Sequence, residues 1–496
     1  MKSVWISVFA LFTNALNYNF IQLTDLHWDP LYSDSKNSNQ FCHYSPFPKN
    51  SFVNPYFGNV ATECDSPTAL INQTFNYLNS IQSKYTIDAV FWTGDSPRHD
   101  RDASVRRTVD EIWTASQHSV NRMLQTFRPS TVILPSIGNW DTEEISFSSP
   151  GDLIQLFEIW KPLWSTELQN QFKDSFLQGG YYIYNDPKSS LSVISLNTLA
   201  WYNENYNLSD CDLKNKNSKH PGNIQFQWLK EMLKTIRKSN RKVILIGHVP
   251  PITHAEIEIY KLNCYDKYIN LVGKYSDIIV TQYYGHVNRD MMYAITKSKS
   301  DFSIIPFSKK ILKKDVGSIQ KQSMIGHFFT GPSIVPYYNP GFRLGSLNIT
   351  QNEIELIGHI QYYADLERLN KDHKVDPDDT NQPKNSTFYN PTCSTIDSFQ
   401  MRKLNINGIR SFLSRIQTEL STPNLKNKPK STLLDSYGDC IKVQYQPANG
   451  VEHLKLDQWV IYTIVFAITV IFSVGIWIAI KGFRSSTQYE QLSEQA

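Results

Sequence analysis

Residues 20–30 read FIQLTDLHWDP, and this stretch decides the fold. An apolar run ends in it at Asp25 and His27, two residues of types that bind metal ions. Further apolar runs rich in β-branched or aromatic residues stop in the same way, at Asp95, Asn139, His248 and His286. Such runs predict buried strands, and the ligand site of an α/β sheet lies beyond the carboxyl ends of its strands. We therefore expect these loops to meet at one site.

Strand and helix patterns alternate over much of the chain. The strand-like runs occupy residues 20–24, 87–93, 132–136, 191–196, 243–247 and 278–282, and only the fourth lacks a metal-type residue at its end. Helical patterns span residues 67–84, 105–127, 223–238 and 256–275. Segments 328–335, 344–350 and 353–361 are expected to complete the sheet, and the lysine-rich stretch 295–322 is interpreted as a surface loop or insertion. The alternation predicts an α/β fold.

The composition excludes some classes of protein. The chain has 496 residues, of which 41% are apolar, so it can bury a substantial core and is not disordered as a whole. Its formal net charge of +3 is close to balance, and we therefore expect no nucleic-acid partner.

Both ends of the chain carry patterns of membrane targeting. Residues 1–18 resemble a secretory signal peptide, with one lysine followed by a short apolar stretch. Residues 459–480 carry no charge and are long enough to cross a bilayer as a helix, and Lys481 and Arg484 follow directly. These features predict a single-pass type I membrane protein with a cytoplasmic tail at residues 481–496.

The cysteines and glycosylation motifs agree with a lumenal or extracellular body. Six cysteines without CxxC spacing favour disulfides over a metal site in a translocated chain. Sequence order suggests the pairs Cys42–Cys64, Cys211–Cys264 and Cys393–Cys440, although other pairings are open. N-glycan sequons are found at Asn72, Asn207, Asn348 and Asn385. We divide the body into a catalytic domain at residues 19–375 and a linker with a small helical module at residues 376–456, stapled if Cys393 and Cys440 pair.

The spacing of the metal-type residues suits two cations. One residue separates Asp25 from His27, and one separates His286 from Asn288, so both members of each pair can face one pocket. Asp95 can bridge two ions, and imidazole, carboxylate and amide ligands together suit ions of the zinc or manganese class. Two such ions hold a hydroxide between them and clamp a phosphoryl group, so hydrolysis of a phosphoester or phosphoanhydride is the expected reaction.

The order of the motifs DxH, GDxxxH, GN, GH and GHxN resembles the calcineurin-like metallophosphoesterase superfamily over residues 20–361. The stretches FWTGDSPRHD, LPSIGNWD, IGHVPP and YYGHVNRD are similar to the acid sphingomyelinase-like branch, and most of all to the vacuolar endopolyphosphatases of fungi. The resemblance implies a β-sandwich flanked by helices that holds two divalent ions, which could be zinc, manganese, cobalt or magnesium. It also implies cleavage of internal phosphoanhydride bonds of inorganic polyphosphate through a metal-bound hydroxide.

The resemblance also implies roles for individual residues. One ion would take Asp25, His27, Asp95 and Asn288, and the other would take Asp95, Asn139, His248 and His286. His99 would donate a proton to the leaving oxygen or contact a phosphate, and Arg98 would bind the polyanion. Two positions depart from the superfamily pattern, since Trp140 and Asn288 stand where many members carry histidine.

Two other functions stay open at this point. The chain could be a sphingomyelinase-like phosphodiesterase that acts on phospholipid head groups or nucleotides. It could also be a catalytically inactive binding ectodomain, if Trp140 and Asn288 have disabled the site. The resemblance suggests that the body faces the lumen of a vacuole or lysosome, with the cell surface as an alternative.

Overall fold

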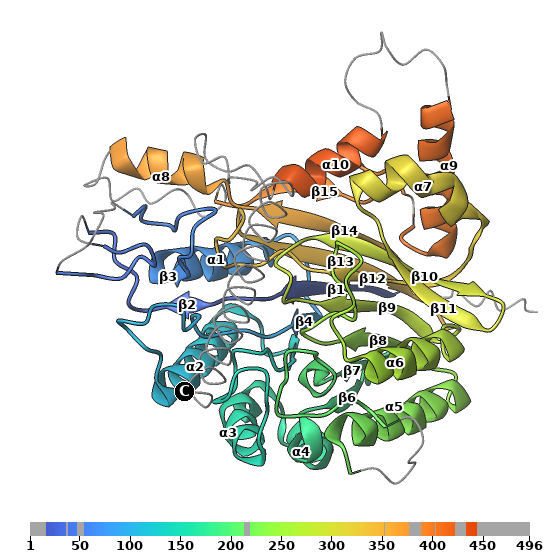
Figure 1. Ribbon diagram of the computed structural model, residues 1–496, viewed down its shortest axis with the longest axis horizontal. Helices are drawn as coiled ribbons and strands as arrows, with labels where there is room; N and C mark the ends of the chain where they lie inside the picture. The colour runs from blue at the N-terminus through green and yellow to red at the C-terminus, as the bar shows by residue number, and fades with distance from the viewer. Residues whose placement is uncertain are drawn as a thin grey trace, which may run out of the picture. The chain divides into compact units, whose positions relative to one another are not determined.

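Two β-sheets pack face to face, and helices cover their outer faces (Figure 1). The computed structural model describes residues 16–35, 38–46, 54–212, 219–351, 353–375, 388–401, 403–421 and 433–443. Between the sheets the ring of Phe20 lies 4.7 Å from that of Phe91 and 5.2 Å from that of Tyr283, measured between ring centroids. All three side chains are fully buried, so the core lies in the layer between the sheets.

The first sheet has the strand order β15-β14-β13-β1-β4-β5. Its parallel part consists of β1 (Leu16–Leu23), β4 (Ala89–Trp92) and β5 (Val132–Pro135). Its antiparallel part consists of β13 (Gly341–Ile349), β14 (Ile354–Tyr363) and β15 (Asn390–Ser394). A short parallel pair, β2 (Trp28–Asp29) with β3 (Ser66–Pro67), lies outside both sheets.

The second sheet has the strand order β11-β10-β12-β9-β8-β7-β6. Its strands are β6 (Tyr182–Asn185), β7 (Leu191–Ser195), β8 (Lys242–Ile246), β9 (Ile279–Tyr284), β10 (Met291–Ser298), β11 (Asp301–Pro306) and β12 (Ser323–Thr330). β7, β8 and β9 run parallel to one another. The six strand-like runs read from the sequence are therefore confirmed as strands, three in the first sheet and three in the second, with β5 at the edge of the first.

The described helices follow the expected alternation with the strands. They are α1 (Thr68–Ile81), α2 (Val109–Thr126), α3 (Pro150–Trp160), α4 (Thr166–Gly179), α5 (Pro221–Lys238), α6 (Leu262–Lys274), α7 (Lys309–Lys321), α8 (Leu366–Val375), α9 (Ile406–Ser421) and α10 (Leu433–Val443), with short 3-10 helices at Lys161–Leu163 and Thr198–Ala200. The pattern at residues 105–127 begins later than expected because Thr108 caps α2: its side chain accepts from the Glu111 N–H, and the Glu111 carboxylate accepts from the Thr108 N–H.

The interpretation of residues 295–322 as a surface loop was wrong. This stretch forms the end of β10, the whole of β11 and helix α7. The stretch contains an amphipathic helix in which Leu312, Val316 and Ile319 recur at helical spacing and are buried. Its many lysines had suggested a loop. The segment thus extends the second sheet instead of interrupting the fold.

The three expected disulfides are present, and the C-terminal module is part of the main body. Cys42 pairs with Cys64, Cys211 with Cys264 and Cys393 with Cys440. β15 joins the first sheet beside β14, and the Tyr437 hydroxyl donates to the Phe307 carbonyl at 2.6 Å. The described residues beyond 375 therefore share the core of the domain that was expected to end there.

Several expectations fall at or beyond the limits of the described residues. β1 begins at Leu16 and Tyr18 is buried, so the folded body includes residues that were assigned to the signal peptide. The expected membrane helix at 459–480, the tail at 481–496, residues 1–15 and the sequon at Asn385 lie outside the described residues. Within the described part of the chain, none of the helices has the length and apolar character needed to cross a bilayer. Asn207 is exposed in the structure, and Asn72 and Asn348 are half-buried.

Candidate metal centre

Loops from both sheets lead to one end of the fold, where the metal-type side chains meet. They follow parallel strands and carry Asp25 and His27 after β1, Asp95 after β4, Asn139 after β5, His248 after β8, and His286 and Asn288 after β9. The loops are joined directly, because the Asp25 N–H donates to the Gly94 carbonyl at 2.9 Å and the Gly285 N–H donates to the His248 carbonyl at 2.9 Å. All residues of the expected ligand set thus lie directly after parallel strands.

Asp95 lies in the middle of this group. Its Oδ2 atom is 3.0 Å from Nε2 of His248 and 3.4 Å from Nε2 of His27. Ligand-type atoms of Asp25, His27 and Asp95 lie within 4.8 Å of one another, and so do those of Asp95, His248 and His286. The two groups share Asp95, which is the arrangement that a carboxylate bridging two ions requires.

The expected ligand set also contains two amides, Asn139 and Asn288. The side-chain amide of Asn139 lies 2.8 Å from Nε2 of His248 and 2.9 Å from Nδ1 of His286. Oδ1 of Asn288 is buried without a hydrogen-bond partner, and so is Oδ1 of Asp25. Buried acceptors without a donor are rare in folded proteins, and a cation would satisfy both oxygens. The donor set of imidazoles, carboxylates and amides therefore fits two divalent ions of the nitrogen- and oxygen-binding class.

The backbone is strained at most of these residues. Asp25, His27, Asp95, His286 and Asn288 all have positive φ, between 40° and 68°. Residues other than glycine rarely adopt this left-handed conformation, and such strain clusters at functional sites. Tight packing enforces the loop paths, since a Cβ atom added at Gly138 would lie 2.3 Å from the Asp95 nitrogen and one at Gly285 would lie 2.0 Å from Oγ1 of Thr24.

Hydrogen bonds from outside the group orient the histidine rings. Nδ1 of His27 lies 3.0 Å from the Pro97 carbonyl, and Nδ1 of His248 lies 2.6 Å from the Thr93 carbonyl. A carbonyl bound to Nδ1 fixes that nitrogen as the donor and leaves Nε2 as the ligand atom. Both Nε2 atoms face Asp95.

Asp141 holds two of the loops in register, a role that the sequence motifs did not reveal. Its buried carboxylate accepts from the N–H groups of Asp95, Ser96 and Gly138 at 2.8–2.9 Å. Burial raises the pKa of Asp141, and the neighbouring Asp95 charge adds to this effect. The only hint in the sequence was its position two residues after Asn139, within GNWD.

The electrostatics around Asp95 favour positive charge on His27 and His248, whereas burial and the His248 charge lower the pKa of His286 to about 4. Burial alone would lower the pKa of His248, but the Asp95 carboxylate outweighs it and raises this pKa to about 9. Burial likewise opposes protonation of His27, yet Asp25 and Asp95 raise its pKa. Asp25 and Asp95 are almost completely excluded from solvent, so their attraction for cations is weakly screened.

His99 is held beside the group by Asp65. Its Nδ1 atom lies 2.6 Å from Oδ1 of Asp65, and its backbone N–H donates to Oδ2 of Asp65 at 2.7 Å. The His99 ring stacks on that of His27, with centroids 3.9 Å apart. Burial lowers the pKa of His99 to about 4. Burial alone would raise the pKa of Asp65, but the contact with His99 outweighs it and lowers this pKa to about 2. Asp65 directly follows Cys64 in the sequence, and no motif assigned it a role.

Arg98 does not have the surroundings expected of a substrate contact. Its side chain is 2% exposed, and its guanidinium donates to the Val105 carbonyl at 3.0 Å and to Glu111 at 3.2 Å. The structure therefore gives Arg98 a packing role at the start of α2, which corrects the expectation. Arg107 contacts the loop that carries Asn139: it donates to the Trp140 carbonyl at 3.0 Å, and its guanidinium lies 5.0 Å from the centroid of the Trp140 ring.

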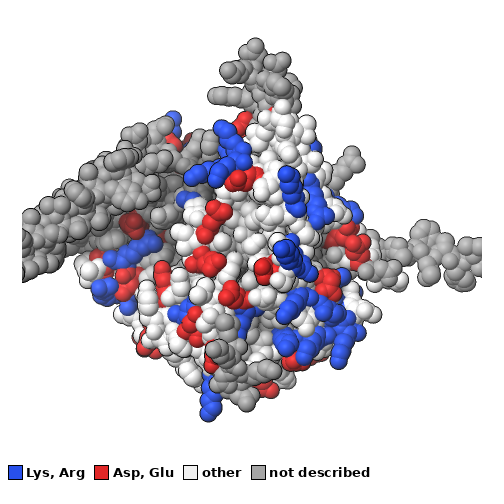
Figure 2. All heavy atoms as spheres, turned by 45° about the vertical axis from the view of Figure 1, so that its right-hand side comes forward, with Lys and Arg blue, Asp and Glu red and all other residues white. Residues whose placement is uncertain are grey.

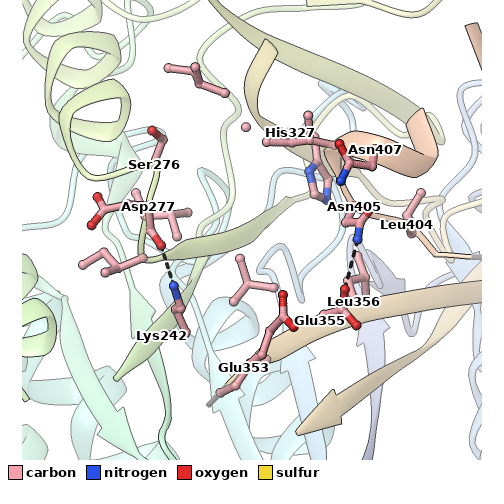
Figure 3. Close-up of a pocket in the computed structure, with 17 residues that line it drawn as sticks. Lys242, Ser276, Asp277, His327, Glu353, Glu355, Leu356, Leu404, Asn405 and Asn407 are labelled. Carbon is pink, nitrogen blue, oxygen red and sulfur yellow. Dashed lines mark hydrogen bonds between the residues drawn. The ribbon is translucent and has the colours of Figure 1, made fainter. Parts of the chain in front are cut away.

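A cavity of about 200 Å³ lies at the other end of the strands (Figure 3). Lys242 and Ile279, the first residues of β8 and β9, contribute to its lining. The buried ring of His327 forms part of its wall, and neither of its nitrogens has a hydrogen-bond partner. The lining carries charges of both signs, including Lys242 and Glu353, and it contains none of the metal-type residues described above. It is therefore separate from the candidate metal centre.

Comparison with protein families decides the class of the fold and of the site. Residues 18–287 match the model of the family described as calcineurin-like phosphoesterase, which is more than half of the chain. The chain belongs to this family. Metallophosphoesterases bind divalent ions, in agreement with the clustered histidines and aspartates.

The curated relatives of this family member include fungal endopolyphosphatases. The chain is 28% identical to that of Cryptococcus neoformans, over 75% of this chain and 64% of that protein. It is 33% identical to that of Schizosaccharomyces pombe, over 54% of this chain and 47% of that protein, and 29% identical to that of Saccharomyces cerevisiae, over 58% and 43%. Each of these matches covers less than two thirds of the relative's own length.

Solved structures give matches of low overall similarity. A dimetal phosphatase from Danio rerio has a TM-score of 0.36 at 9% identity, over 68% of this chain and 98% of that chain. The structure of PhoD has a TM-score of 0.38 at 12% identity, over 71% of this chain and 70% of that chain.

Replacement of Asp95 tests the shared carboxylate. We expect the purified chain, dialysed against Zn²⁺ or Mn²⁺, to hold two ions and Asp95→Ala to hold at most one, because both groups lose a ligand. Elemental analysis by mass spectrometry measures the stoichiometry. Asp100→Asn is a suitable control, since this carboxylate in the same loop binds Arg106 and the Arg107 N–H instead of the centre. Two ions retained by Asp95→Ala would contradict the shared site.

Proposed function

We propose that this chain is an endopolyphosphatase, a hydrolase that cuts internal phosphoanhydride bonds of inorganic polyphosphate. The observation that carries the proposal is the pair of ligand groups joined through Asp95. The names of the curated relatives support polyphosphate as the substrate. Two divalent ions at this position would supply the activation of water and the neutralisation of phosphate charge.

The protein's own residues would set the geometry of the reaction. Asp141 fixes the loops that carry Asp95 and Asn139, so the distance between the ligand groups changes little when substrate binds. The carbonyls of Pro97 and Thr93 keep the rings of His27 and His248 in one orientation. A centre that is already positioned needs little rearrangement at the moment of reaction.

His99 would transfer a proton to the leaving phosphate oxygen in its protonated form, which its pKa of about 4 allows only at acidic pH. Asp65 occupies its Nδ1 atom, which leaves Nε2 as the only ring nitrogen that can reach a substrate. The stacking on His27 places the ring at the edge of the ligand group. Asp65 is therefore proposed as a positioning residue, because it acts on the reaction only through the orientation of His99.

Arg107 is the side chain that would replace Arg98 as the phosphate contact in this proposal. It is half-buried beside Trp140. Burial lowers the pKa of its guanidinium, and the charges of Asp95 and Asp141 are near enough to oppose this lowering in part. A planar guanidinium forms paired hydrogen bonds with phosphate oxygens.

The proposed topology follows the sequence patterns at the two ends. The signal peptide, the membrane helix at residues 459–480 and the glycans would place the catalytic body in the lumen of a vacuole or lysosome. The exposed sequon at Asn207 and the three disulfides support an oxidising, lumenal location.

The length of the products tests the reaction. The unsubstituted chain with divalent ions should shorten long polyphosphate to intermediate lengths, and His248→Ala should remove this activity because one ligand group is lost. Gel electrophoresis of the products measures their lengths. Release of orthophosphate alone would rule out internal cleavage. Faster cleavage of a phosphocholine diester or of a nucleoside triphosphate would instead favour the phosphodiesterase function.

Asp65→Asn tests the orientation of His99. We expect kcat on polyphosphate to fall by roughly 100-fold, the lower end of the contribution of a positioned acid–base group, while two ions stay bound. His99→Gln should cause a similar loss, and the double variant should lose little more, because both residues act as a unit. Steady-state kinetics together with metal analysis checks this. Additive losses in the double variant would separate Asp65 from His99.

Removal of N-glycans tests the topology. Treatment of the expressed chain with an N-glycosidase should lower its apparent mass, and Asn207→Gln should remove one step of that shift. In sealed membranes the body should resist protease while an epitope on residues 481–496 is cleaved. Cleavage of the body in sealed membranes would reverse the proposed orientation.

A further inference from the structure

Helix α7 begins with a cluster of lysines. Its sequence is KKILKKDVGSIQK, so four of its first six residues are lysines, namely Lys309, Lys310, Lys313 and Lys314. Ser308 caps the helix by accepting from the Ile311 N–H at 3.2 Å, and no acidic residue is present in the first turn. Basic residues are thus concentrated at the end of the helix where acidic residues are favoured.

This placement is unfavourable for the helix itself. The backbone dipole is positive at the N-terminus, and two like-charged pairs, Lys309 with Lys313 and Lys310 with Lys314, are four residues apart. Lys309 is compensated by an ion pair with Asp435 of α10 at 2.7 Å. Lys314 is 79% exposed, and it forms a long ion pair with the adjacent Asp315, at 3.9 Å. Basic residues at a helix N-terminus that acidic partners do not fully compensate indicate a functional surface.

The lysines lie at the catalytic end of the second sheet. β10 begins three residues after Asn288, and the Phe307 N–H donates to the Met292 carbonyl at 2.8 Å just before α7 starts. Met292 is four residues beyond Asn288, so at most about 14 Å of extended chain separates them. Lys310, Lys313 and Lys314 are exposed in the first two turns that follow.

Other basic residues provide a contrast within the same structure. Figure 2 shows lysine and arginine side chains gathered in several groups on the side of the molecule where α5, α6 and α7 lie. Lys230 and Lys238 of α5 and Lys274 of α6 are exposed as well. The C-terminal ends of these helices precede β8 and β9, so Lys238 and Lys274 lie toward the end of the strands opposite the metal centre.

We propose that Lys310, Lys313 and Lys314 form a docking surface for the distal part of a long polyphosphate chain whose reacting bond lies at the metal centre. This inference rests on the proposed function. A flexible polyanion with one charge on each unit gains from several cations at a distance from the reacting bond. Anchoring a distant part of the chain also presents an internal bond to the centre, which favours cleavage away from the chain ends.

The test compares two triple substitutions with the same change in charge. In the full chain, Lys310→Gln, Lys313→Gln and Lys314→Gln together should raise KM for long-chain polyphosphate by about 5- to 10-fold and weaken its dependence on salt. The kcat on tripolyphosphate should not change, because the proposed surface binds the distal part of a long chain, which tripolyphosphate lacks. The control combines Lys230→Gln, Lys238→Gln and Lys274→Gln, and we expect it to leave the KM for long chains within two-fold.

The outcomes separate the inference from the proposed function. An unchanged KM for long chains in the α7 triple variant overturns the docking surface, and so does an equal rise in the control, which would point to total charge. Circular dichroism shows whether the variant keeps the overall helix content of the chain; loss of like-charge repulsion should leave helix content unchanged or higher. If the α7 variant loses helix, the single variant Lys314→Gln decides, with a smaller rise in KM expected. Failure of the unsubstituted chain to cut any polyphosphate would instead reject the proposed function itself.

Discussion

The attraction of two buried carboxylates for positive charge is the interaction on which the site depends. Asp25 and Asp95 are almost free of solvent contact, and each lies close to a histidine ring. A buried charge is very unfavourable unless a partner neutralises it. The fold brings loops from two different sheets to one place, so that cations or imidazole groups can surround both carboxylates and neutralise their charge. The parallel strands of the sandwich thus place the loops that carry the ligand residues at one end of the fold.

The strained loops remain in place because the strands beneath them are locked together. Between the sheets, the buried Arg343 of β13 donates to Gln22 of β1 and to Asp290 beyond β9, in both cases at 2.6 Å. Gln22 in turn donates to the Tyr284 carbonyl at 2.9 Å. This network connects the strands that carry Asp25 and His286, and it offsets the unfavourable backbone conformations of the loops. These hydrogen bonds in the core therefore fix the geometry of the loops at the candidate metal centre.

The sequence predicted the central strands and the residues at their ends because both depend on local patterns. A buried strand is visible as an apolar run, and a ligand is visible as a polar residue directly after it. The partners of those ligands were harder to find. Asp65 reaches His99 across a sequence separation of 34, and Asp141 acts on the backbone of a different loop, so no spacing rule reveals either contact.

Some predictions were wrong because charged side chains were taken as a sign of exposure to solvent or substrate. The lysines of residues 295–322 suggested a loop, although Leu312 and its neighbours at helical spacing indicated a buried face. Arg98 was expected to bind substrate because it stands between Asp95 and His99, but adjacent residues in a tight loop point in different directions. Helix boundaries moved where capping side chains, such as Thr108, decided the first turn. Only the Arg98 case depends on contacts with another element; the helix pattern of α7 and the Thr108 cap are local features.

Trp140 shows why a departure from the superfamily pattern does not imply an inactive site. Its backbone N–H donates to Oδ1 of Asp95 at 2.8 Å, so the residue still supports the shared carboxylate. Its ring packs edge-on against His99, with centroids 4.9 Å apart, and Arg107 lies on the ring. The indole thus fills the space of the missing histidine and confines His99 between itself and His27. A site that had lost its function would have no need to hold His99 in this way, which argues against an inactive binding ectodomain.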